Sequence, residues 1–309
     1  MKVSILSART GWHTDELVRA LAARDHRAAV VPYEGLVART GGGQGRLSSH
    51  AEQLLEVDAV LARIIPNGSL EQIIYRVDAL HWLQQHRVLV MNTPLAIERS
   101  VDKFYTTALL HEAGIPTPET VVCEGVADAM SAVREFGDAV IKPLFGSMGH
   151  GMVRVSDPDV AFRVTRALEQ VRSVFYVQRV VDHGGRDVRA FVVGNHVLGA
   201  IERIAAGGDW RTNVARGASV GSFELPDAWA QLAVRAAALV GADYAGVDLL
   251  PARDGSVFVL EVNGIPGWQG LQRATGLDVA GAIIRHLEGA AERGVPACAA
   301  GAALRPGRM

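Results

Sequence analysis

Three kinds of feature are scarce or missing in this 309-residue chain. It has two cysteines, Cys123 and Cys298, which make neither a disulfide framework nor a zinc spacing. No run approaches the roughly 18 apolar residues that a membrane span needs, and residues 1–6 are too short for a signal peptide. The net charge of −2 argues against the excess of positive charge that is typical of nucleic-acid-binding proteins. These absences favour a cytoplasmic protein that binds neither nucleic acid nor a membrane.

The composition is that of a globular protein. Apolar residues make up 49% of the chain and charged residues 21%. The length is enough for two domains or one elaborate domain. Residues 291–309 are rich in alanine, glycine and proline, which predicts a loose tail.

Apolar strand-like segments alternate with helical patterns over residues 1–95. Strands are expected at 3–6, 28–31, 58–65 and 88–91, and helices at 14–24 and 69–85. This alternation predicts a small parallel sheet with helices on both faces. Residues 39–46 contain four glycines. They predict a flexible loop, because the lysine and hydroxyl residue of a Walker loop are missing.

The sequence after residue 95 predicts a compact α+β unit, followed by an antiparallel hairpin. The α+β unit covers about 115–180, after a helix that reaches residue 111. The hairpin joins 187–193 to 196–204 through a Gly-Asn turn. A polar loop at 210–220, a helix at 227–240, strands at 246–249 and 258–264, and a closing helix at 279–287 follow.

Three oxygen-bearing side chains interrupt the two apolar strands near the end of the chain. Glu261 and Asn263 are two residues apart, so they share a strand face. If the strands pair around the turn at 253–255, Asp248 reaches the same face. Two carboxylates and an amide oxygen suit Mg²⁺. Solvated acids on edge strands are the alternative, although acids inside apolar strands are costly unless paired or ligated.

A lysine followed by three glycines is the second chemical feature. Lys142 ends a predicted strand, and Gly146, Gly149 and Gly151 follow before the next strand. Glycines let backbone N–H groups approach phosphate oxygens, and the lysine adds a point charge. The loop joins two strands, so it is neither a Walker nor a Rossmann motif. A glycine hairpin with a surface lysine remains equally open.

Charged residues also lie on the hairpin and in the polar loop after it. The hairpin carries Asp187, Arg189, Glu202 and Arg203, and the loop carries Arg211, Asn213 and Arg216. Cross-strand ion pairs on an exposed sheet would explain the first group. Arginines in the loop suit a carboxylate or a developing phosphoryl charge. Simple solvation explains them as well.

The combination of these motifs resembles the ATP-grasp superfamily, in particular the RimK-like α-L-glutamate ligases. The resemblance covers about residues 55–290, and no single motif is specific alone. The residues that carry it are Lys103, Lys142, 146–151, 178–181, 187–194, 200–203, 209–213, Asp248 and 261–267.

The resemblance implies an α/β and α+β fold in which two lobes sandwich ATP. Residues 1–95 would form a Rossmann-like pre-ATP-grasp domain, 96–180 the central lobe and 181–290 the C-terminal lobe. It also implies ATP with Mg²⁺, or Mn²⁺, as cofactors. The nucleotide-binding residues would be Lys103, Lys142, Gly146, Ser147, Gly149, Gly151, Gln178, Arg179, Val180, Val181 and Asp187. The metal ligands would be Asp248, Glu261 and Asn263.

In that family the enzyme phosphorylates a carboxylate to an acyl phosphate, which an amine then attacks. Arg203, Arg211 and Asn213 are the expected catalytic residues. The partners would be an amino acid, with glutamate favoured, and an acceptor carboxylate on a small molecule such as a tetrahydromethanopterin-type pterin or on a ribosomal protein C-terminus. The oligomeric state, including a homo-oligomer, stays open.

The sequence departs from the family pattern in two regions. Leu144 and Phe145 precede the glycine loop where a polar residue is common, and Gln178-Arg179 replaces the commoner Gln-Glu. The N-terminal lobe is atypical at 41–43 and 63–68. Since that lobe helps to select the acceptor, these departures leave the acceptor open and lean toward a small molecule. A catalytically silent ATP-binding regulator is the alternative function.

Overall fold

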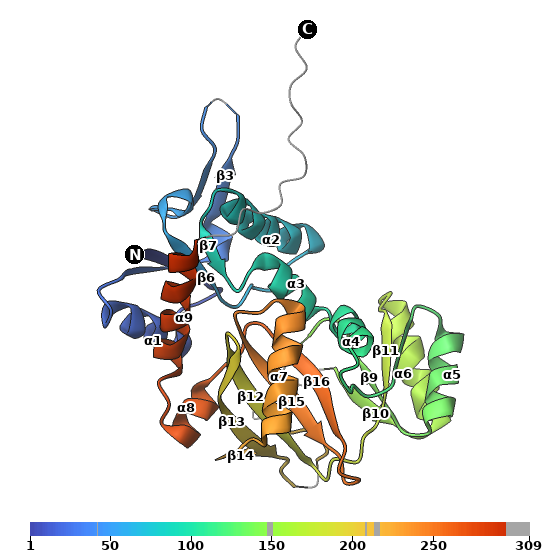
Figure 1. Ribbon diagram of the computed structural model, residues 1–309. Helices are drawn as coiled ribbons and strands as arrows, with labels where there is room; N and C mark the ends of the chain where they lie inside the picture. Colours follow the sequence, from blue (N-terminus) through green and yellow to red (C-terminus); the bar gives the residue numbers. More distant parts are fainter. Residues whose placement is uncertain (42, 147–150, 208, 213–216, 295–309) are drawn as a thin grey trace. The chain divides into compact units, whose positions relative to one another are not determined.

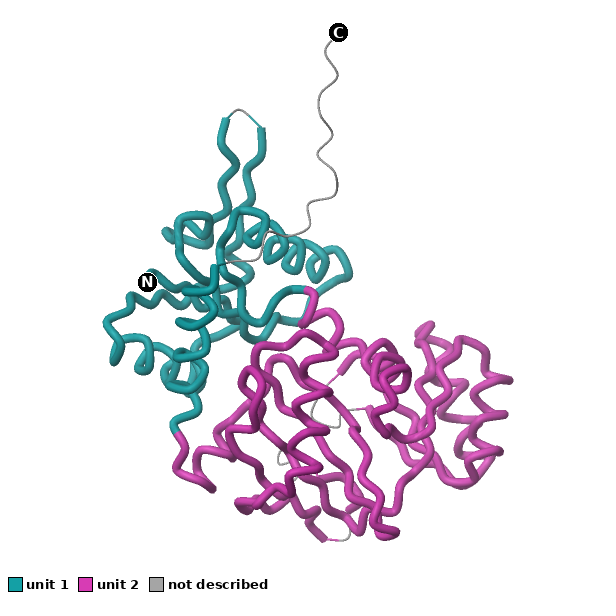
Figure 2. Tube along the Cα trace, viewed as in Figure 1, with its two compact units in different colours: residues 1–94, 278–309 teal, residues 95–277 magenta. Residues whose placement is uncertain are grey.

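A computed structural model of the chain describes residues 1–41, 43–146, 151–207, 209–212 and 217–294 (Figure 1). They form two compact units (Figure 2). Unit 1 comprises residues 1–94 together with those from 278 onward, and unit 2 comprises residues 95–277. In the described part of the chain, no helix is both long and apolar enough to cross a membrane.

Unit 1 is built on a four-stranded parallel sheet, as the alternating pattern predicts. The strand order is β2-β1-β6-β7, and every pairing is parallel. Apolar strands that are buried on both faces are typical of such sheets, and all four residues of β6 are buried. The elements are β1 (Lys2–Leu6), α1 (Trp12–Ala22), β2 (Arg27–Val31), β6 (Ala59–Ala62), α2 (Leu70–Gln85) and β7 (Leu89–Met91).

Residues 39–46, predicted as a flexible loop, lie instead at the tip of a β-hairpin. Strands β3 (Leu36–Arg39) and β4 (Arg46–Ser49) pair antiparallel, and β5 (Glu52–Gln53) completes a small sheet. Short 3-10 helices flank it at Tyr33–Gly35 (η1) and Leu54–Glu56 (η2). The glycines serve the turn, since Gly41 and Gly43 have positive φ angles of 79° and 130°. The prediction missed the strands because they are short and mostly exposed.

The last helix, α9 (Val279–Arg293), belongs to unit 1. Glu288 pairs with Arg24 at 2.5 Å, and Asp278 pairs with Arg19 at 2.6 Å. The predicted C-terminal lobe, residues 181–290, includes most of this helix, and that limit stays a prediction. The structure also continues the helix to Arg293, past the expected start of the tail. The other predicted domain limits remain predictions.

Unit 2 begins with two helices and a four-stranded antiparallel sheet. The sheet has the order β10-β9-β11-β8. Its helix α6 starts where the Asp157 side chain accepts hydrogen bonds from two backbone N–H groups. The elements are α3 (Pro94–Val101), α4 (Lys103–Glu112), β8 (Thr120–Cys123), α5 (Val126–Phe136), β9 (Ala139–Lys142), β10 (Val153–Val155), α6 (Pro158–Gln170) and β11 (Phe175–Arg179).

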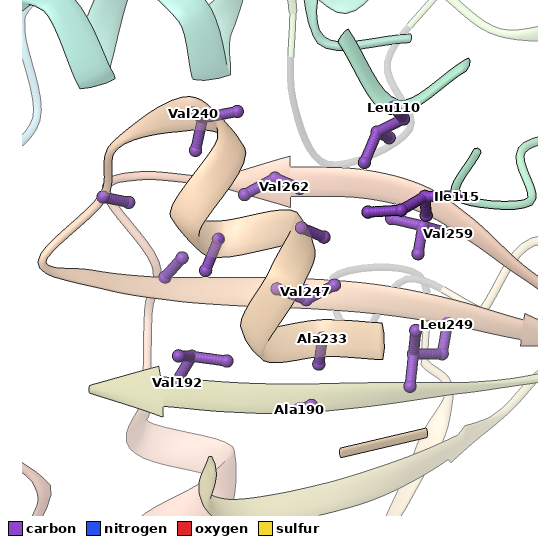
Figure 3. Close-up of a cluster of buried hydrophobic side chains, with 14 of the residues drawn as sticks. Leu110, Ile115, Ala190, Val192, Ala233, Val240, Val247, Leu249, Val259 and Val262 are labelled. Carbon is purple, nitrogen blue, oxygen red and sulfur yellow. The ribbon is translucent and has the colours of Figure 1, made fainter. Parts of the chain in front are cut away.

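A five-stranded antiparallel sheet forms the rest of unit 2, with the order β14-β13-β12-β15-β16. Helix α7 packs on it through Ala233, Ala236 and Ala237, which are fully buried (Figure 3). These small side chains let the helix approach the sheet closely. The elements are β12 (Arg186–Val193), β13 (His196–Ile204), β14 (Ser219–Ser222), α7 (Asp227–Val240), β15 (Tyr244–Pro251), β16 (Val257–Asn263) and α8 (Gln269–Thr275). Helices α3 and α8 and strand β14 were not predicted.

Candidate active site

Four charged residues form a buried group on the five-stranded sheet, which we call the arginine cluster: Asp187, Arg189, Arg203 and Asp248. The register places Asp187 opposite Arg203, and Arg189 opposite Asp248. Arg203 donates to both oxygens of Asp187 at 2.6 and 2.5 Å, and Arg189 donates to both oxygens of Asp248 at 2.6 and 2.7 Å. Arg203 also lies 2.9 Å from Asp248, which links the two pairs. Thr212 donates a further hydrogen bond to Asp187 at 2.5 Å.

Burial and charge act in opposite directions on these groups. Burial alone would raise the pKa of Asp248, but the charges and hydrogen bonds of Arg189 and Arg203 outweigh it and lower that pKa to about 2. Burial raises the pKa of Asp187 despite its contacts with Arg203 and Thr212. The two carboxylates raise the pKa of Arg203, which therefore stays charged. Cross-strand ion pairs on an exposed sheet were one explanation for the charged residues of the hairpin. Asp187 and Arg203 do pair across the strands, but they are buried.

The three predicted metal ligands come together on neighbouring strands. Asp248 lies opposite Glu261, and Asn263 lies opposite Gly246, so the strands pair around the turn as expected. Asn263 Oδ1 accepts a hydrogen bond from the Ile265 backbone N–H at 2.9 Å. In the described part of the chain, Glu261 has no ion pair or hydrogen bond through its side chain. Glu261 and Asn263 therefore fit a hard cation, whereas Asp248 fits one only with a lone pair left free by its arginines.

A second polar group, the lysine network, lies on the four-stranded sheet: Lys142, Gln178, Tyr176, Thr107 and Thr120. Lys142 is buried and donates to Gln178 Oε1 at 2.5 Å. Gln178 Nε2 in turn donates to Thr120 Oγ1 at 2.9 Å and to the Tyr176 hydroxyl at 3.2 Å. The Tyr176 and Thr107 hydroxyls are 2.8 Å apart. Among the described residues, the hydrogen-bond partner of Lys142 is thus a neutral amide.

Lys103, at the start of α4, approaches the residues that lead into the glycine loop. Its ammonium donates to the backbone oxygens of Leu144 and Gly146 at 3.2 and 2.8 Å. Burial lowers the pKa of Lys103, and Glu261 partly offsets this. Burial also lowers the pKa of Lys142 to about 8, against the attraction of Glu261. The charge of Lys103 lowers it further, so the two lysines repel each other across one site.

The described ends of the glycine loop require glycine. Gly146 and Gly151 have φ angles of 146° and 73°, and a side chain on either would meet the Pro143 ring at 3.4 Å. The positive φ angles explain why glycine occupies both positions. Ser147 and Gly149, which were also predicted to contact phosphate, lie outside the described residues.

Residues 178–181, predicted to line adenine, run along and past the end of β11. The Gln178 side chain is used to support Lys142, a role that the sequence did not suggest. The Arg179 and Val180 N–H groups donate to Glu119 and Asp138 backbone oxygens at 2.9 and 3.0 Å. Arg179 also pairs with Glu119 at 2.7 Å. Val180 and Val181 are half-buried.

The predicted catalytic residues are placed in different settings. Arg203 is buried between the carboxylates of Asp187 and Asp248. Arg211 is more accessible: its Nε lies 3.1 Å from Asp209 Oδ1, and its guanidinium lies 5.5 Å from the centre of the Trp210 ring. Asn213 lies outside the described residues.

Sequence reasoning missed the residues that position the others. Arg189 was assigned no role, and Tyr176, Thr107 and Thr120 were not singled out. A usable signal existed for Arg189, which shares a strand face with Asp187, but its partner depends on a register that the sequence does not give. The hydroxyl residues look like ordinary strand and helix positions.

Unit 2 contains two sheet lobes. Lysines come from α4 and β9, and acids come from β15 and β16. This arrangement is that of the ATP-grasp class of fold. Solved structures support this: a peptide-bound ATP-grasp ligase, PsnB, with Mg and ADP superimposes with a TM-score of 0.73 at 21% identity, covering 94% of this chain and 98% of the other. A RimK-domain ATP-grasp protein from Sphaerobacter thermophilus gives a TM-score of 0.69 at 24% identity, covering 93% of this chain and 100% of the other.

Comparison with family models and with related sequences identifies the family within the ATP-grasp class. Residues 100–287 match the RimK-like ATP-grasp domain, and residues 1–97 match the RimK pre-ATP-grasp domain. The chain therefore belongs to the RimK-like ATP-grasp ligase family. It is 36% identical to the tetrahydromethanopterin:alpha-L-glutamate ligase of Methanosarcina acetivorans, over 76% of this chain and 81% of that protein. It is 34% identical to a probable alpha-L-glutamate ligase of Trichodesmium erythraeum, over 93% and 96%.

Proposed function

We propose that this protein is an ATP- and Mg²⁺-dependent carboxylate–amine ligase that adds L-glutamate to an acceptor carboxylate. The observation that carries the proposal is the lysine network. Lys142 is buried and donates to the neutral Gln178 side chain, and the charge of a second lysine, Lys103, acts on the same site. Two ammonium groups that form no ion pair within 4.0 Å among the described residues suit the phosphates of a nucleotide.

The binding roles follow from the placement of each group. Lys142 and Lys103 would neutralise nucleotide phosphates, and the backbone of the glycine loop would close over them. Residues 178–181 would contact adenine through backbone groups. Asp187 would face the ribose, using lone pairs that its bonds to Arg203 and Thr212 leave available.

Glu261, Asn263 and Asp248 would hold the metal ion, with Mg²⁺ preferred and Mn²⁺ as a substitute. When bound, the ion would offset the negative charge of the nucleotide phosphates. Glu261 and Asn263 have oxygen lone pairs for this purpose. Asp248 would contribute a lone pair that the two guanidinium groups leave free, or Arg189 would withdraw.

In the proposed reaction, an acceptor carboxylate oxygen attacks the terminal phosphorus of ATP, and the bond to ADP breaks. The glutamate amine then attacks the acyl carbon, an amide forms, and phosphate leaves with the former carboxylate oxygen. Arg211 is the accessible arginine that would stabilise the transferred phosphoryl group, assisted by Asn213. Arg203 would contribute indirectly, because it holds the carboxylates of Asp187 and Asp248 in position. Positioning and charge neutralisation are the main tasks of such a site.

The acceptor is proposed from the relatives and from the departures in the first 97 residues. Relatives named for tetrahydromethanopterin support a pterin-like small molecule, and the ATP-grasp ligases solved with precursor peptides support a peptide carboxylate as the second candidate. The two cysteines and the small net charge fit a protein of the cytoplasm, which forms part of the proposal.

The test is a product assay on the full chain with Mg²⁺, ATP and labelled L-glutamate. One arm contains a pterin with a carboxylate tail, a second a peptide with a glutamate C-terminus, and a third no acceptor. Acceptor-dependent ADP release, with a mass increase of one glutamyl residue, supports the ligase. Aspartate in place of glutamate tests the amino acid. Labelled product in one acceptor arm alone identifies the acceptor class.

A catalytically silent ATP-binding regulator is the rival function. It predicts tight ATP binding without ADP release in any acceptor arm, including an extract from cells. The match to the ligase family and the retained acids on β15 and β16 favour the enzyme, because a protein that only binds ATP does not need to keep a metal site.

A further inference from the structure

A small pocket in unit 1 lies apart from every residue assigned above. It has a volume of about 170 Å³ and is lined by Tyr33, Glu34, Leu36, Gln72, Tyr75 and Arg76. One wall is η1 with the start of β3, and the other is helix α2. A single water needs roughly 10–15 Å³ by a comparable measure, so the pocket holds a group of several heavy atoms.

Arg76 is the unusual residue of this pocket. Its side chain is 5% exposed, and among the described residues no carboxylate lies within 4.0 Å of it. Its Nη1 donates to the backbone oxygen of Pro66 at 2.7 Å and, more weakly, to that of Asn67 at 3.5 Å. A buried guanidinium without a counter-charge is costly, because neutral carbonyl groups do not balance its charge.

The remaining donors of Arg76 are free to serve a ligand. Nε and Nη2 make no hydrogen bond to the described residues, yet neither is among the buried polar atoms that lack a partner. They therefore touch solvent, and Arg76 lines the pocket. Together they form the edge with which arginine holds two oxygens of a carboxylate or phosphate.

The chain before α2 fixes this guanidinium in place. A Cβ atom on Gly68 would come within 3.0 Å of Arg76 Nη1 and 2.7 Å of Gln72 Oε1, so glycine lets the backbone pass close to both side chains. The carbonyl groups that hold Nη1 belong to the 63–68 segment, which departs from the family pattern. A held cation with two open donors is preorganised for an anion.

We propose that this pocket is a binding subsite for a small anionic group, a carboxylate or a phosphate. Glu34 lines the same pocket but is exposed, so water screens its charge more than that of Arg76. Its carboxylate weakens binding of an anion without abolishing it. The proposal does not rest on ligase activity, because the test below measures binding alone.

The test uses the full chain with a saturating non-hydrolysable ATP analogue and Mg²⁺, so that the terminal-phosphate position of the nucleotide site is also filled. The thermal unfolding midpoint is followed as inorganic phosphate or, separately, glutarate is added at constant ionic strength. Saturable stabilisation is expected for at least one probe. A response to phosphate alone, to glutarate alone or to both tells which anion the pocket accepts. No saturable response to either overturns the proposal.

Variants separate a ligand role of Arg76 from a structural one. Arg76→Gln should weaken the apparent Kd for the anion at least about tenfold. The matched control, Arg27→Gln, removes an equal charge from an exposed position of unit 1 and should leave the Kd unchanged. If Arg76→Gln lowers the unfolding midpoint but keeps the wild-type anion response, the residue only ties down the chain and the proposal fails. Should Arg76→Gln not fold, Glu34→Gln decides: tighter anion binding supports the subsite, and unchanged binding overturns it.

Discussion

The arginine cluster and the lysine network lie in the same unit but balance their charges in opposite ways. In the arginine cluster, two guanidinium groups face two carboxylates, and each carboxylate is held by paired hydrogen bonds of 2.5–2.7 Å. The group is neutral as a whole, and its donors are used within the protein. Such a group fixes strands β12, β13 and β15 in register, and an added anion would gain little from it.

The lysine network is short of negative charge. In the part of the chain that the structure describes, neither Lys103 nor Lys142 has a carboxylate within 4.0 Å, and burial lowers the pKa of both. An incoming phosphate would supply the missing charge. The chain contains only three lysines against 28 arginines, and two of the three lie here. We infer from this difference that the arginines, which are paired with carboxylates, stabilise the structure of the site. The lysines, which form no such ion pair among the described residues, are available to bind a ligand.

The largest effect is expected from Lys142→Met. Loss of the ammonium should lower kcat/KM for glutamate-dependent ADP formation about a thousandfold, or roughly 4 kcal/mol, since a preorganised donor to a developing charge is removed. The free energy of unfolding should stay within about 1 kcal/mol of wild type. Relief of the buried charge offsets the loss of the hydrogen bond to Gln178. Steady-state kinetics and urea unfolding measure the two quantities.

Lys2→Met is the matched control for this variant. Lys2 is the third lysine and makes an exposed ion pair with Glu52 at 2.7 Å. Its loss should leave the kinetics unchanged. A Lys142→Met protein that keeps more than a tenth of wild-type activity would contradict the role given to the lysine network.

Asp187→Ala should lower the free energy of unfolding, which Lys142→Met should leave nearly unchanged. It leaves Arg203 buried with Asp248 as its only carboxylate partner, and it deprives Thr212 of its acceptor. Breaking a buried pair by removing one partner costs about 3 kcal/mol in the free energy of unfolding. Urea unfolding checks this value. Glu202→Ala, which breaks the exposed pair between Arg186 and Glu202, should cost less than about 1 kcal/mol. Equal losses for the two variants would refute the contrast between buried and exposed pairs.

The fold was largely predictable from the sequence because its main elements carry strong patterns. The parallel sheet of unit 1 follows from alternating apolar strands and helices, and the hairpin of β12 and β13 was predicted from its Gly-Asn turn. The ion pairs of α9 with Arg19 and Arg24 were not predictable, because these partners lie more than 250 positions away in the chain. Contacts at such separation leave no local pattern.

The candidate site was predictable in its residues but not in their pairings. Glu261 and Asn263 were placed on one face from the two-residue period of strands, and Asp248 was expected on that face if the strands paired; the register places Asp248 opposite Glu261. The Arg189–Asp248 pair and the Gln178–Lys142 bond were not foreseen. They depend on which strands are neighbours and on side-chain direction, and a single sequence fixes neither.

The two clusters should also differ in their response to pH. Because the pKa of Lys142 is about 8, the ammonium loses its proton as the pH rises from 7 to 9, and the Kd for ATP should rise about tenfold. Lys142→Met should remove most of this rise. The stability of the ligand-free protein should change in the opposite sense. Its unfolded state, with the ordinary lysine pKa of 10.5, binds more protons between pH 8 and 10.5, so this lysine makes unfolding less favourable as the pH rises through that window.

Asp248 and Arg203 of the arginine cluster should be silent over the same range, since Asp248 titrates near 2 and the pKa of Arg203 lies above its usual value. Calorimetric ATP titrations at several pH values measure the first effect, and urea unfolding of the ligand-free protein measures the second. An ATP affinity that stays flat from pH 7 to 9 would contradict the pKa assigned to Lys142.

The smallest effect is expected from Tyr176→Phe, which removes one hydroxyl behind the lysine. Gln178 keeps its bond to Thr120 and still accepts from Lys142, so the network loses support without losing its charge. The expected cost is about 1 kcal/mol in stability, with ATP affinity falling about twofold to fivefold. Thr107→Val removes the other side of the same hydroxyl contact and should act no more than additively with Tyr176→Phe. If Tyr176→Phe lowered activity as far as Lys142→Met does, the hydroxyl would have to touch the substrate directly, and the network would be more than a support for the lysine.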